Sequence, residues 1–331
     1  MTRDKVLAMI IAGNGYVSGE SISRELGITR AAVNAAVKQI KELGYEIESS
    51  TRKGYRLLSS PDLMNPGEIL ARLPDERTRD ITVLDTVGST NNTLKEMARQ
   101  GAPAGSVVIS DEQTGGKGRR GRSFLSPSGT GIYLSYLMIP GNGRGSISEV
   151  TAWTAVAVQE AIKEVCSVAC DIKWVNDLLI NKRKICGILT ELSVVAESGE
   201  IENVIIGIGI NVNEQKNDFP EELRDIATSI SAECGRKISR ADLAACIIRK
   251  LDALASDWPA GKDKYLEEYR KACITTGTAV SVNNLASSAA RTGTAVGIND
   301  DFSLQVLFDD TKTEEKVNSG EVSVRGLYGY T

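Results

Sequence analysis

The sequence predicts an α/β (α+β) protein built from three consecutive units. Residues 1–60 hold short capped helix patterns followed by two strand-like runs. Residues 67–272 alternate strand and helix patterns with few prolines, which is typical of an α/β domain around a mostly antiparallel or mixed sheet. From residue 274 to residue 331 short alternating runs indicate a small all-β barrel that is SH3-like in size.

The first unit has the pattern of a winged helix-turn-helix. We expect a short apolar helix at Lys5–Ala12, a second helix that Ser18 caps and that runs to Leu26, and a third at Arg30–Leu43. The runs YEIES and GYRLL then flank a basic tip and predict a two-stranded wing. The apolar positions expected to form one small core are Ile22, Leu26, Ile28, Val33, Val37 and Ile40.

Charge separates this unit from the rest of the chain. Residues 1–60 carry nine Lys and Arg against six Asp and Glu, whereas the whole chain has a net charge of −4. A basic module on an acidic body indicates two different partners. DNA is the favoured partner of the basic module, with a protein-interaction domain as the alternative. The expected DNA-binding residues are Thr29, Arg30 and Asn34 on the third helix, with Lys38, Arg52 and Lys53 on phosphates. The segment Asn34–Ala36, expected to be exposed, is short of cations.

Composition excludes several classes of chemistry. The chain contains no histidine, which removes Ser-His and Cys-His nucleophile schemes, and its six scattered cysteines do not have zinc-ligand spacing. No apolar run is long enough to span a membrane, and no secretory signal is recognisable, so a cytoplasmic protein is expected. Catalysis would have to use Lys, Arg, carboxylates and backbone amides.

The run VIIGIGINVN at 204–213 predicts a strand with an unusual face. Alternation directs Ile206, Ile208 and Ile210 to the core and leaves Gly207 and Gly209 together on the other face. Two successive glycines on one face create a flat slot against which a ligand can lie. A bulge, or a helix packed closely on the sheet, is the alternative explanation.

Two further segments concentrate polar groups. The run KWVNDLLINKRKICGILTEL predicts a hairpin with a basic turn at Asn181–Lys184, and Asp177 near its start could be a turn residue or help to hold a nucleotide–metal complex. The run DTVGSTNNTLKEMARQ predicts a strand end and a helix that Ser89 or Thr90 caps. A helix start of this kind offers unpaired N–H donors and hydroxyls to a polar head group.

The segment GGKGRRGR, residues 115–122, fits no regular element because glycine disfavours helix and strand and the four cations repel one another. It lacks the GK[ST] ending of a Walker A loop, and its formal GxGxxG match has no surrounding βαβ unit. It therefore predicts a flexible cationic flap that closes on a phosphate or carboxylate and becomes ordered when it is filled.

The motifs DEQTGGKGRRGR, KWVNDLLINKRKICGIL, VIIGIGINVN and SGEVSVRGLYG, in this order along the whole chain, resemble the biotin–protein ligase family. With the winged helix-turn-helix, they resemble its bifunctional members, which are also biotin operon repressors. The resemblance implies a central domain like that of class II synthetases. A lipoate ligase shares the general fold but would not be expected to carry the RRGR flap.

The resemblance also implies roles for individual residues. The implied catalytic residues are Lys184, Arg119 and Asp177. The implied biotin-binding residues are Ser89, Thr90, Asn91, Gln113, Gly116, Lys117, Gly118, Arg119, Lys184, Gly187, Gly207 and Gly209. The implied ATP- and adenylate-binding residues are Lys117, Arg119, Arg120, Arg122, Trp174, Asn176, Asp177, Asn211 and Arg325. Asp177 is the implied residue for Mg²⁺ that accompanies ATP.

For this family, the resemblance implies that ATP converts biotin to biotinyl-5′-adenylate, after which a lysine of a biotin carboxyl carrier protein, as in acetyl-CoA or pyruvate carboxylase, accepts the biotinyl group. It implies no prosthetic group and no membrane partner. The adenylate-bound form is expected to be a homodimer that occupies biotin operator DNA. A non-catalytic biotin-sensing transcription factor and a ligase for lipoate or another acyl group are the alternatives.

The sequence departs from the common family pattern at three sites and in lacking histidine. Lys117 replaces the first arginine of the flap, and Val175 replaces a proline, so that the turn is less preset. Ala35 and Ala36 stand where many relatives carry Lys-His, which concerns operator recognition rather than ligation.

Overall fold

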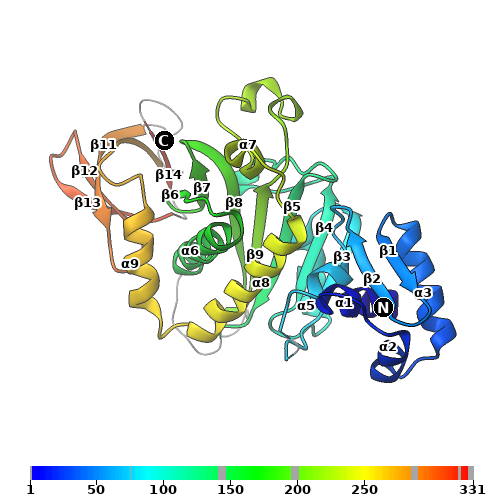
Figure 1. The fold of residues 1–331 in the computed structure, drawn as a ribbon. Coiled ribbons are helices and arrows are strands. Elements are labelled where there is room, and N and C mark those ends of the chain that lie inside the picture. Colours follow the sequence, from blue (N-terminus) through cyan, green and yellow to red (C-terminus); the bar gives the residue numbers. More distant parts are fainter. Residues whose placement is uncertain are drawn as a thin grey trace.

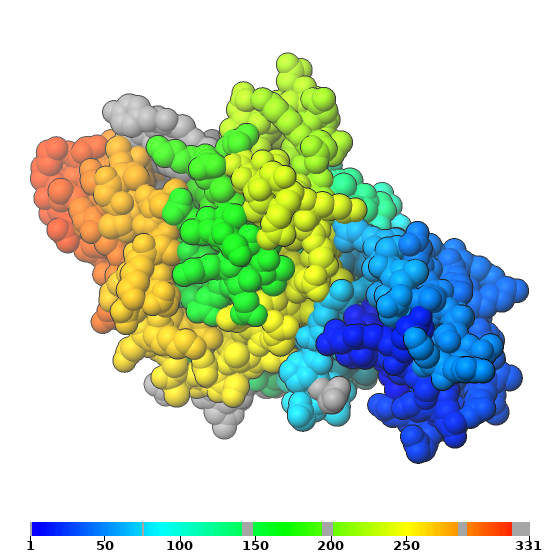
Figure 2. Space-filling view, in the orientation of Figure 1, coloured from blue at the N-terminus to red at the C-terminus, as the bar shows by residue number. Residues whose placement is uncertain are grey.

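The structure, a computed structural model, describes residues 2–74, 76–140, 147–194, 201–284, 290–319 and 322–326. Figure 1 shows the N-terminal helices and the two-stranded wing at one end, a large central sheet, and a small C-terminal sheet at the other end. In the space-filling view of Figure 2 the N-terminal unit projects from the central body. None of the helices in the described ranges is both long and apolar enough to cross a bilayer.

The N-terminal unit has the predicted elements, namely helices α1 (Thr2–Ala12), α2 (Gly19–Leu26) and α3 (Arg30–Glu42) followed by strands β1 (Glu46–Ser50) and β2 (Gly54–Ser59). Its helix starts follow from local side-chain chemistry. The Ser18 hydroxyl accepts the Ser21 N–H at 3.0 Å, and the Thr29 hydroxyl accepts the Ala32 N–H at 3.1 Å. Gly27 ends α2 with a left-handed φ of 63°.

The expected core of this unit is confirmed, with one correction on α3. Ile22, Val33, Val37 and Ile40 are buried, and Leu26 and Ile28 pack against them. Ala36, predicted to lie on the exposed face, is only 4% exposed and belongs to the core. Its position three residues from Val33 and four from Ile40 places it on the inward stripe of the helix.

The linker packs between the N-terminal unit and the central body. Helix α4 (Pro66–Leu70) begins at Asn65, whose side chain accepts the Gly67 N–H at 2.8 Å. A Cβ at Gly67 would lie 2.5 Å from the Asp4 carbonyl oxygen, so α1 and α4 approach too closely for any side chain there. The two elements are therefore in direct backbone contact.

The central sheet has the order β3-β4-β5-β9-β8-β7-β6, and only the β3–β4 pair is parallel, which confirms a mixed and mostly antiparallel sheet. Its strands are β3 (Ile81–Val87), β4 (Val107–Gln113), β5 (Gly131–Met138), β6 (Asp171–Lys173), β7 (Asp177–Ile180), β8 (Arg183–Val194) and β9 (Ile201–Asn211). Residues 124–130 form a loop that leads from the flap segment into β5.

Helices cover both faces of this sheet. Helices α6 (Ile147–Cys166), α8 (Arg240–Asp257) and α9 (Lys262–Ala272) pack in the main core with Ile206, Ile208 and Ile210 of β9, as the alternation predicted. Helix α5 (Thr90–Arg99) lies on the opposite face, where Leu94 contacts a second cluster that includes Ile205. The glycines of β9 therefore face α5. A short helix, α7 (Ile230–Cys234), follows the sheet.

The C-terminal unit is an antiparallel sheet in the order β13-β12-β11-β10-β14. Its strands are β10 (Ala279–Asn284), β11 (Ala290–Ile298), β12 (Leu304–Phe308), β13 (Glu314–Val317) and β14 (Val322–Gly326). It is joined to the central sheet through Trp174, whose indole N–H donates to the Phe302 carbonyl at 2.9 Å. All six cysteines are free thiols, and five of them are buried.

Candidate functional site

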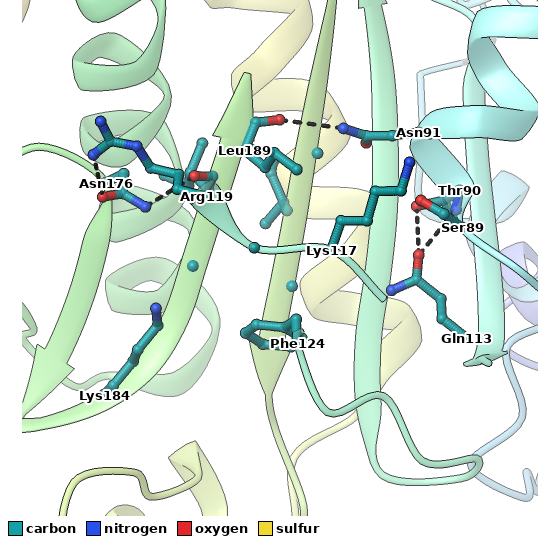
Figure 3. Close-up of a pocket in the computed structure, with 16 residues that line it drawn as sticks. Ser89, Thr90, Asn91, Gln113, Lys117, Arg119, Phe124, Asn176, Lys184 and Leu189 are labelled. Atoms are coloured by element: carbon teal, nitrogen blue, oxygen red, sulfur yellow. Dashed lines mark hydrogen bonds between the residues drawn. The ribbon is translucent and has the colours of Figure 1, made fainter. Parts of the chain in front are cut away.

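The pocket that carries the sequence motifs lies on the α5 face of the central sheet, under the flap (Figure 3). Its floor is the glycine face of β8 and β9, where Gly187 pairs directly with Gly209. The ring of Phe124 lies above them, because a Cβ at Gly209 would be 2.6 Å from that ring. A Cβ at Gly207 would be 2.3 Å from the Asn91 Oδ1 atom. Side chains are therefore excluded from this face, as the sequence predicted.

Polar side chains gather at one end of the pocket, at the start of α5. Ser89 occupies the N-cap position, as one of the two expected residues, but its hydroxyl makes no capping hydrogen bond. The Gln113 Oε1 atom accepts the Thr90 N–H at 2.9 Å and the Thr90 hydroxyl at 3.1 Å instead. Its Nε2 atom donates to the Ser126 hydroxyl at 3.0 Å, so the Gln113 amide is fixed in orientation.

The side chain of Asn91 is held in place by Glu191 and Ser135, which the sequence did not single out. Its Nδ2 atom donates to Glu191 at 2.7 Å, and its Oδ1 atom accepts the Ser135 hydroxyl at 2.6 Å. Lys95 forms an ion pair with Glu191 at 2.5 Å. Burial raises the pKa of Glu191, but the hydrogen bonds from Lys95 and Asn91 outweigh it and hold this pKa below its ordinary value. Asn91 therefore lines the pocket with its amide already committed to protein partners.

The flap is an irregular hairpin. Backbone bonds join Phe124 N to the Gly116 oxygen at 2.9 Å and Gly118 N to the Arg122 oxygen at 2.7 Å, and a short 3₁₀ turn at Arg119–Gly121 forms the tip. A Cβ at Gly116 would lie 2.4 Å from the Phe124 carbonyl oxygen, so the hairpin requires glycine there. Its ordering on ligand binding stays a prediction.

Arg119 crosses from the flap to the far wall of the pocket. Its guanidinium donates to the Asn176 side chain at 3.1 Å and to the Ser319 carbonyl of the C-terminal unit. Burial and the neighbouring Arg120 charge lower the pKa of Arg119 from its ordinary value. Lys117 also lines the pocket and donates to Asn92 at 2.9 Å. These two cations of the flap therefore face the site.

Lys184 lies at the other end of the pocket, opposite the polar group at α5 (Figure 3). Its amine forms an ion pair with Asp177 at 2.7 Å. The sequence placed Lys184 in the basic turn, but it lies inside β8, because Asn181 and Lys182 with φ of 49° and 63° complete a two-residue turn. The strand fixes the direction of this side chain.

Several residues assigned from the resemblance lie elsewhere. Arg120 and Arg122 are exposed outside the pocket lining. Trp174 is buried against the C-terminal sheet rather than at the pocket, and the Asn211 amide donates to the Thr228 carbonyl at 3.1 Å. The side chain of Arg325 lies outside the described residues.

The donor set at the pocket does not fit a resident metal ion. The Asp177 carboxylate is engaged by Lys184, and within the described ranges no three Cys, Asp or Glu side chains gather as a ligand set. The role that the geometry supports for Asp177 is to orient the Lys184 amine.

The pocket has little free space. Its volume is ≈ 50 Å³, whereas sites for small organic ligands measure about 300–1,000 Å³. The Phe124 ring fills the space above the glycine floor, so a ligand of that size requires this ring and the flap to move. Phe124 was missed from the sequence, although it directly follows the cationic segment. Leu189, which shares the face of Gly187, was missed as well; Ile188 and Ile208 border the pocket, but their side chains belong to the main core.

A second hollow lies between α3 and the wing in the N-terminal unit. Arg30, Asn34, Lys38 and Arg52 line it, as a DNA-facing surface would require. Arg30 also pairs with Glu20, and the Tyr55 hydroxyl donates to the Asn34 side chain. The side chains predicted to contact DNA are thus brought to one face, with Thr29 committed to capping α3.

The wing adds one cation beside that hollow. The Lys53 amine lies 5.3 Å from the centre of the Tyr16 ring, within the range of a cation–π contact. This contact holds the amine at the tip of the wing, where the sequence predicted a phosphate contact. Lys53 is not part of the hollow's lining.

The chain combines a helix-turn-helix unit with a pocket under a cationic flap, the arrangement of a ligand-binding protein that also carries a DNA-binding unit. Residues 83–211 match the biotin/lipoate A/B protein ligase family, and residues 2–56 match an HTH domain. The chain is 42% identical over 242 residues to the bifunctional ligase/repressor BirA of Bacillus subtilis, which covers 73% of this chain and 74% of that protein. It therefore belongs to the biotin/lipoate A/B protein ligase family.

Two further comparisons agree with this assignment. The bifunctional ligase/repressor BirA of Escherichia coli is 30% identical over 247 residues, which cover 75% of this chain and 74% of that protein. The structure of a biotin protein ligase from Aquifex aeolicus in complex with biotin and ATP is similar to this structure, with a TM-score of 0.64 and 27% sequence identity. That similarity covers 75% of this chain and 99% of the Aquifex chain.

Proposed function

We propose that this chain is an ATP-dependent biotin–protein ligase that also represses transcription. The observation that carries the proposal is the assembly, in one pocket, of a side-chain-free floor, a fixed polar end at Thr90 and Gln113, and the cations Lys184 and Arg119 at the other end. An apolar ring system with a polar head and a carboxylate tail suits this order of groups. Biotin has that order, and relatives of this chain are named as biotin–[acetyl-CoA-carboxylase] ligases.

In the first step the biotin carboxylate attacks the α-phosphorus of ATP, the bond to the β-phosphate oxygen breaks, and pyrophosphate leaves. Lys184 and Arg119 stabilise the negative charge that develops on the α-phosphate oxygens, and Asp177 keeps the Lys184 amine in place. Each such donor contributes about 3–4 kcal/mol to the transition state. The Ser89 hydroxyl and the Gln113 amide hold the polar head of biotin.

In the second step a lysine amine of a carrier protein attacks the biotinyl carbonyl, an amide forms, and AMP leaves. The anhydride must survive until the carrier arrives, so water has to be kept out. The bond from Arg119 to Asn176 draws the flap across the pocket and serves this purpose. Mg²⁺ arrives on the phosphates of ATP rather than in a site built by the protein.

The second half of the proposal is biotin-dependent repression. The N-terminal unit, residues 1–60, places α3 in the major groove of operator DNA and the wing on phosphates, in a cytoplasmic homodimer with adenylate bound. The basic hollow of this unit and the name of its relatives, ligase/repressor, support this half. We further propose that residues 67–272 form the catalytic domain and that residues 274–331 close as an SH3-like barrel.

The test is incubation of the purified chain with ATP, labelled biotin and a biotin carboxyl carrier domain. We expect covalent label on one carrier lysine, together with pyrophosphate release. Lys184→Ala should lower pyrophosphate release about 10²–10³-fold. Lys182→Ala is the matched control, because this exposed lysine lies two residues away in the hairpin turn.

The outcomes separate the alternatives. Tight biotin binding without label transfer would favour a non-catalytic biotin sensor. Transfer of lipoate in preference to biotin would identify the chain as a lipoate–protein ligase. Equal rates for Lys184→Ala and Lys182→Ala would remove Lys184 from the mechanism.

A further inference from the structure

One arginine outside the pocket connects the linker of the N-terminal unit to the base of the flap. Arg240 is the first residue of α8, and its side chain is only 1% exposed. Its guanidinium donates to the Asp62 carboxylate at 3.3 Å and to the Asp62 carbonyl at 2.6 Å. It also donates to the Asp111 carboxylate at 2.7 Å and to the Gly131 carbonyl at 3.2 Å.

The Asp62 side of this cluster belongs to the linker. Asp62 lies between β2 and α4, and its carboxylate also accepts the Arg240 backbone N–H at 3.2 Å and the Asn213 amide at 3.1 Å. A few residues further on, α4 is in backbone contact with α1. Displacement of Asp62 would therefore disturb the packing of the N-terminal unit against α4.

The Asp111 side belongs to the flap. Asp111 lies in β4, just before the flap hairpin, and Gly131 is the first residue of β5, just after it. The second carboxylate oxygen of Asp111 accepts the Gly129 N–H at 3.0 Å and the Ser128 hydroxyl. Arg240 thus contacts both arms of the hairpin at the point where they leave the sheet.

Burial makes this connection rigid. A buried guanidinium that loses its hydrogen-bond acceptors costs free energy, so Arg240 tends to keep its contacts to the linker and to the flap at the same time. Arg77, which precedes β3, offers a comparison, because its buried side chain bonds Asp252 at 2.7 Å and the Gly105 carbonyl at 2.6 Å. Gly105 lies just before β4 and Asp252 lies further along α8, so neither partner belongs to the linker or the flap.

We propose that Arg240 is a positioning residue that couples the linker of the N-terminal unit to the base of the ligand-binding flap. Closure of the flap on the adenylate shifts Asp111 and Gly131, and Arg240 transmits the shift to Asp62 and the linker. Coupling of this kind is reciprocal, so the packing of the N-terminal unit also affects the rate at which the adenylate dissociates. The inference rests on the proposed function, because it requires a ligand that closes the flap.

Amide hydrogen exchange of the full chain, with and without biotin and ATP, tests the coupling. We expect ligand to slow exchange at least tenfold in flap peptides covering 112–123 and several-fold in linker peptides covering 60–66. In Arg240→Lys and in Asp62→Asn the linker response should disappear while the flap response remains. Arg77→Lys, which removes comparable buried contacts elsewhere, should keep both responses.

A second measurement uses the reciprocal effect. Adenylate should dissociate about tenfold faster from Asp62→Asn than from the unaltered chain, as expected for loss of a hydrogen bond to a charged group. Arg77→Lys should not change this rate. If Arg240→Lys and Asp62→Asn caused only a structural defect, their unfolding midpoints would fall, but ligand would still slow amide exchange in the linker.

The results distinguish two kinds of failure. A flap response without any linker response in the unaltered chain overturns the coupling and leaves the proposed function standing. A linker response that persists in Arg240→Lys overturns the role of this residue. Absence of a flap response in the unaltered chain removes the proposed function and the coupling with it.

Discussion

Glu214 makes a quantitative prediction about pH. Its side chain is 1% exposed, one carboxylate oxygen accepts the Thr130 hydroxyl at 3.1 Å, and the other has no partner among the described residues. Burial raises its pKa from 4.5 to about 7, against the opposing effects of its hydrogen bonds and of Arg240. The folded protein therefore binds this proton more tightly than the unfolded chain does.

The sign and size of the effect follow from linkage. Between pH 4.5 and 7 the folded state holds a proton that the unfolded state has released, so stability falls as pH rises through this window. A pKa change from 4.5 to about 7, at about 1.4 kcal/mol for each factor of ten, corresponds to about 3 kcal/mol. Glu214→Gln removes the ionisation and keeps the shape of the side chain.

Urea unfolding at pH 5, 6, 7 and 8 measures this prediction. The free energy of unfolding of Glu214→Gln should approach that of the unaltered chain at pH 5 and exceed it by about 2–3 kcal/mol at pH 8. Glu202→Gln, a change at an exposed glutamate in β9, is the control and should show no such trend. A stability difference that stays constant from pH 5 to pH 8 would refute the reasoning.

Three further predictions concern the pocket and the N-terminal unit. Arg119→Ser removes the bonds to Asn176 and Ser319, so labelled adenylate should escape about 10–100-fold faster, and exposed Arg120→Ser should not have this effect. Gly209→Ala places a methyl group 2.6 Å from the Phe124 ring and should weaken biotin binding at least tenfold in calorimetry, whereas Gly297→Ala, which enters open space, should bind normally. Deletion of residues 1–60 should abolish operator binding in a gel-shift assay but keep part of the ligation activity; operator binding by the shortened chain would contradict the domain assignment.

Local interactions explain why much of the fold could be predicted. The caps at Ser18 and Thr29 act within three residues, and the alternation in β9 assigns each side chain to a face without any distant partner. The glycine floor, the cations of the flap and the polar start of α5 were found for the same reason. Their ligand roles, in contrast, stay predictions until they are measured.

Errors arose where position along the chain is a poor guide to position in space. Ala36 seemed exposed, but it lies on the inward stripe of α3. Lys184 was assigned to a turn. Pairing between β7 and β8 limits this turn to two residues and places Lys184 in β8. The partners of Trp174 and Asn211, at Phe302 and Thr228, could not be predicted from any local pattern, and the nucleotide contacts implied for these two residues stay predictions.

The sequence alone determined the helices and the wing of the N-terminal unit, which face of β9 is bare, and where positive charge is concentrated, since these depend on neighbours a few residues apart. Tertiary structure decided which cations face the pocket, that Phe124 covers the glycine floor, and that Arg240 contacts both Asp62 and Asp111. Those contacts join residues far apart along the chain. They exist only because packing of α8 against the sheet and the linker brings the groups together and buries them.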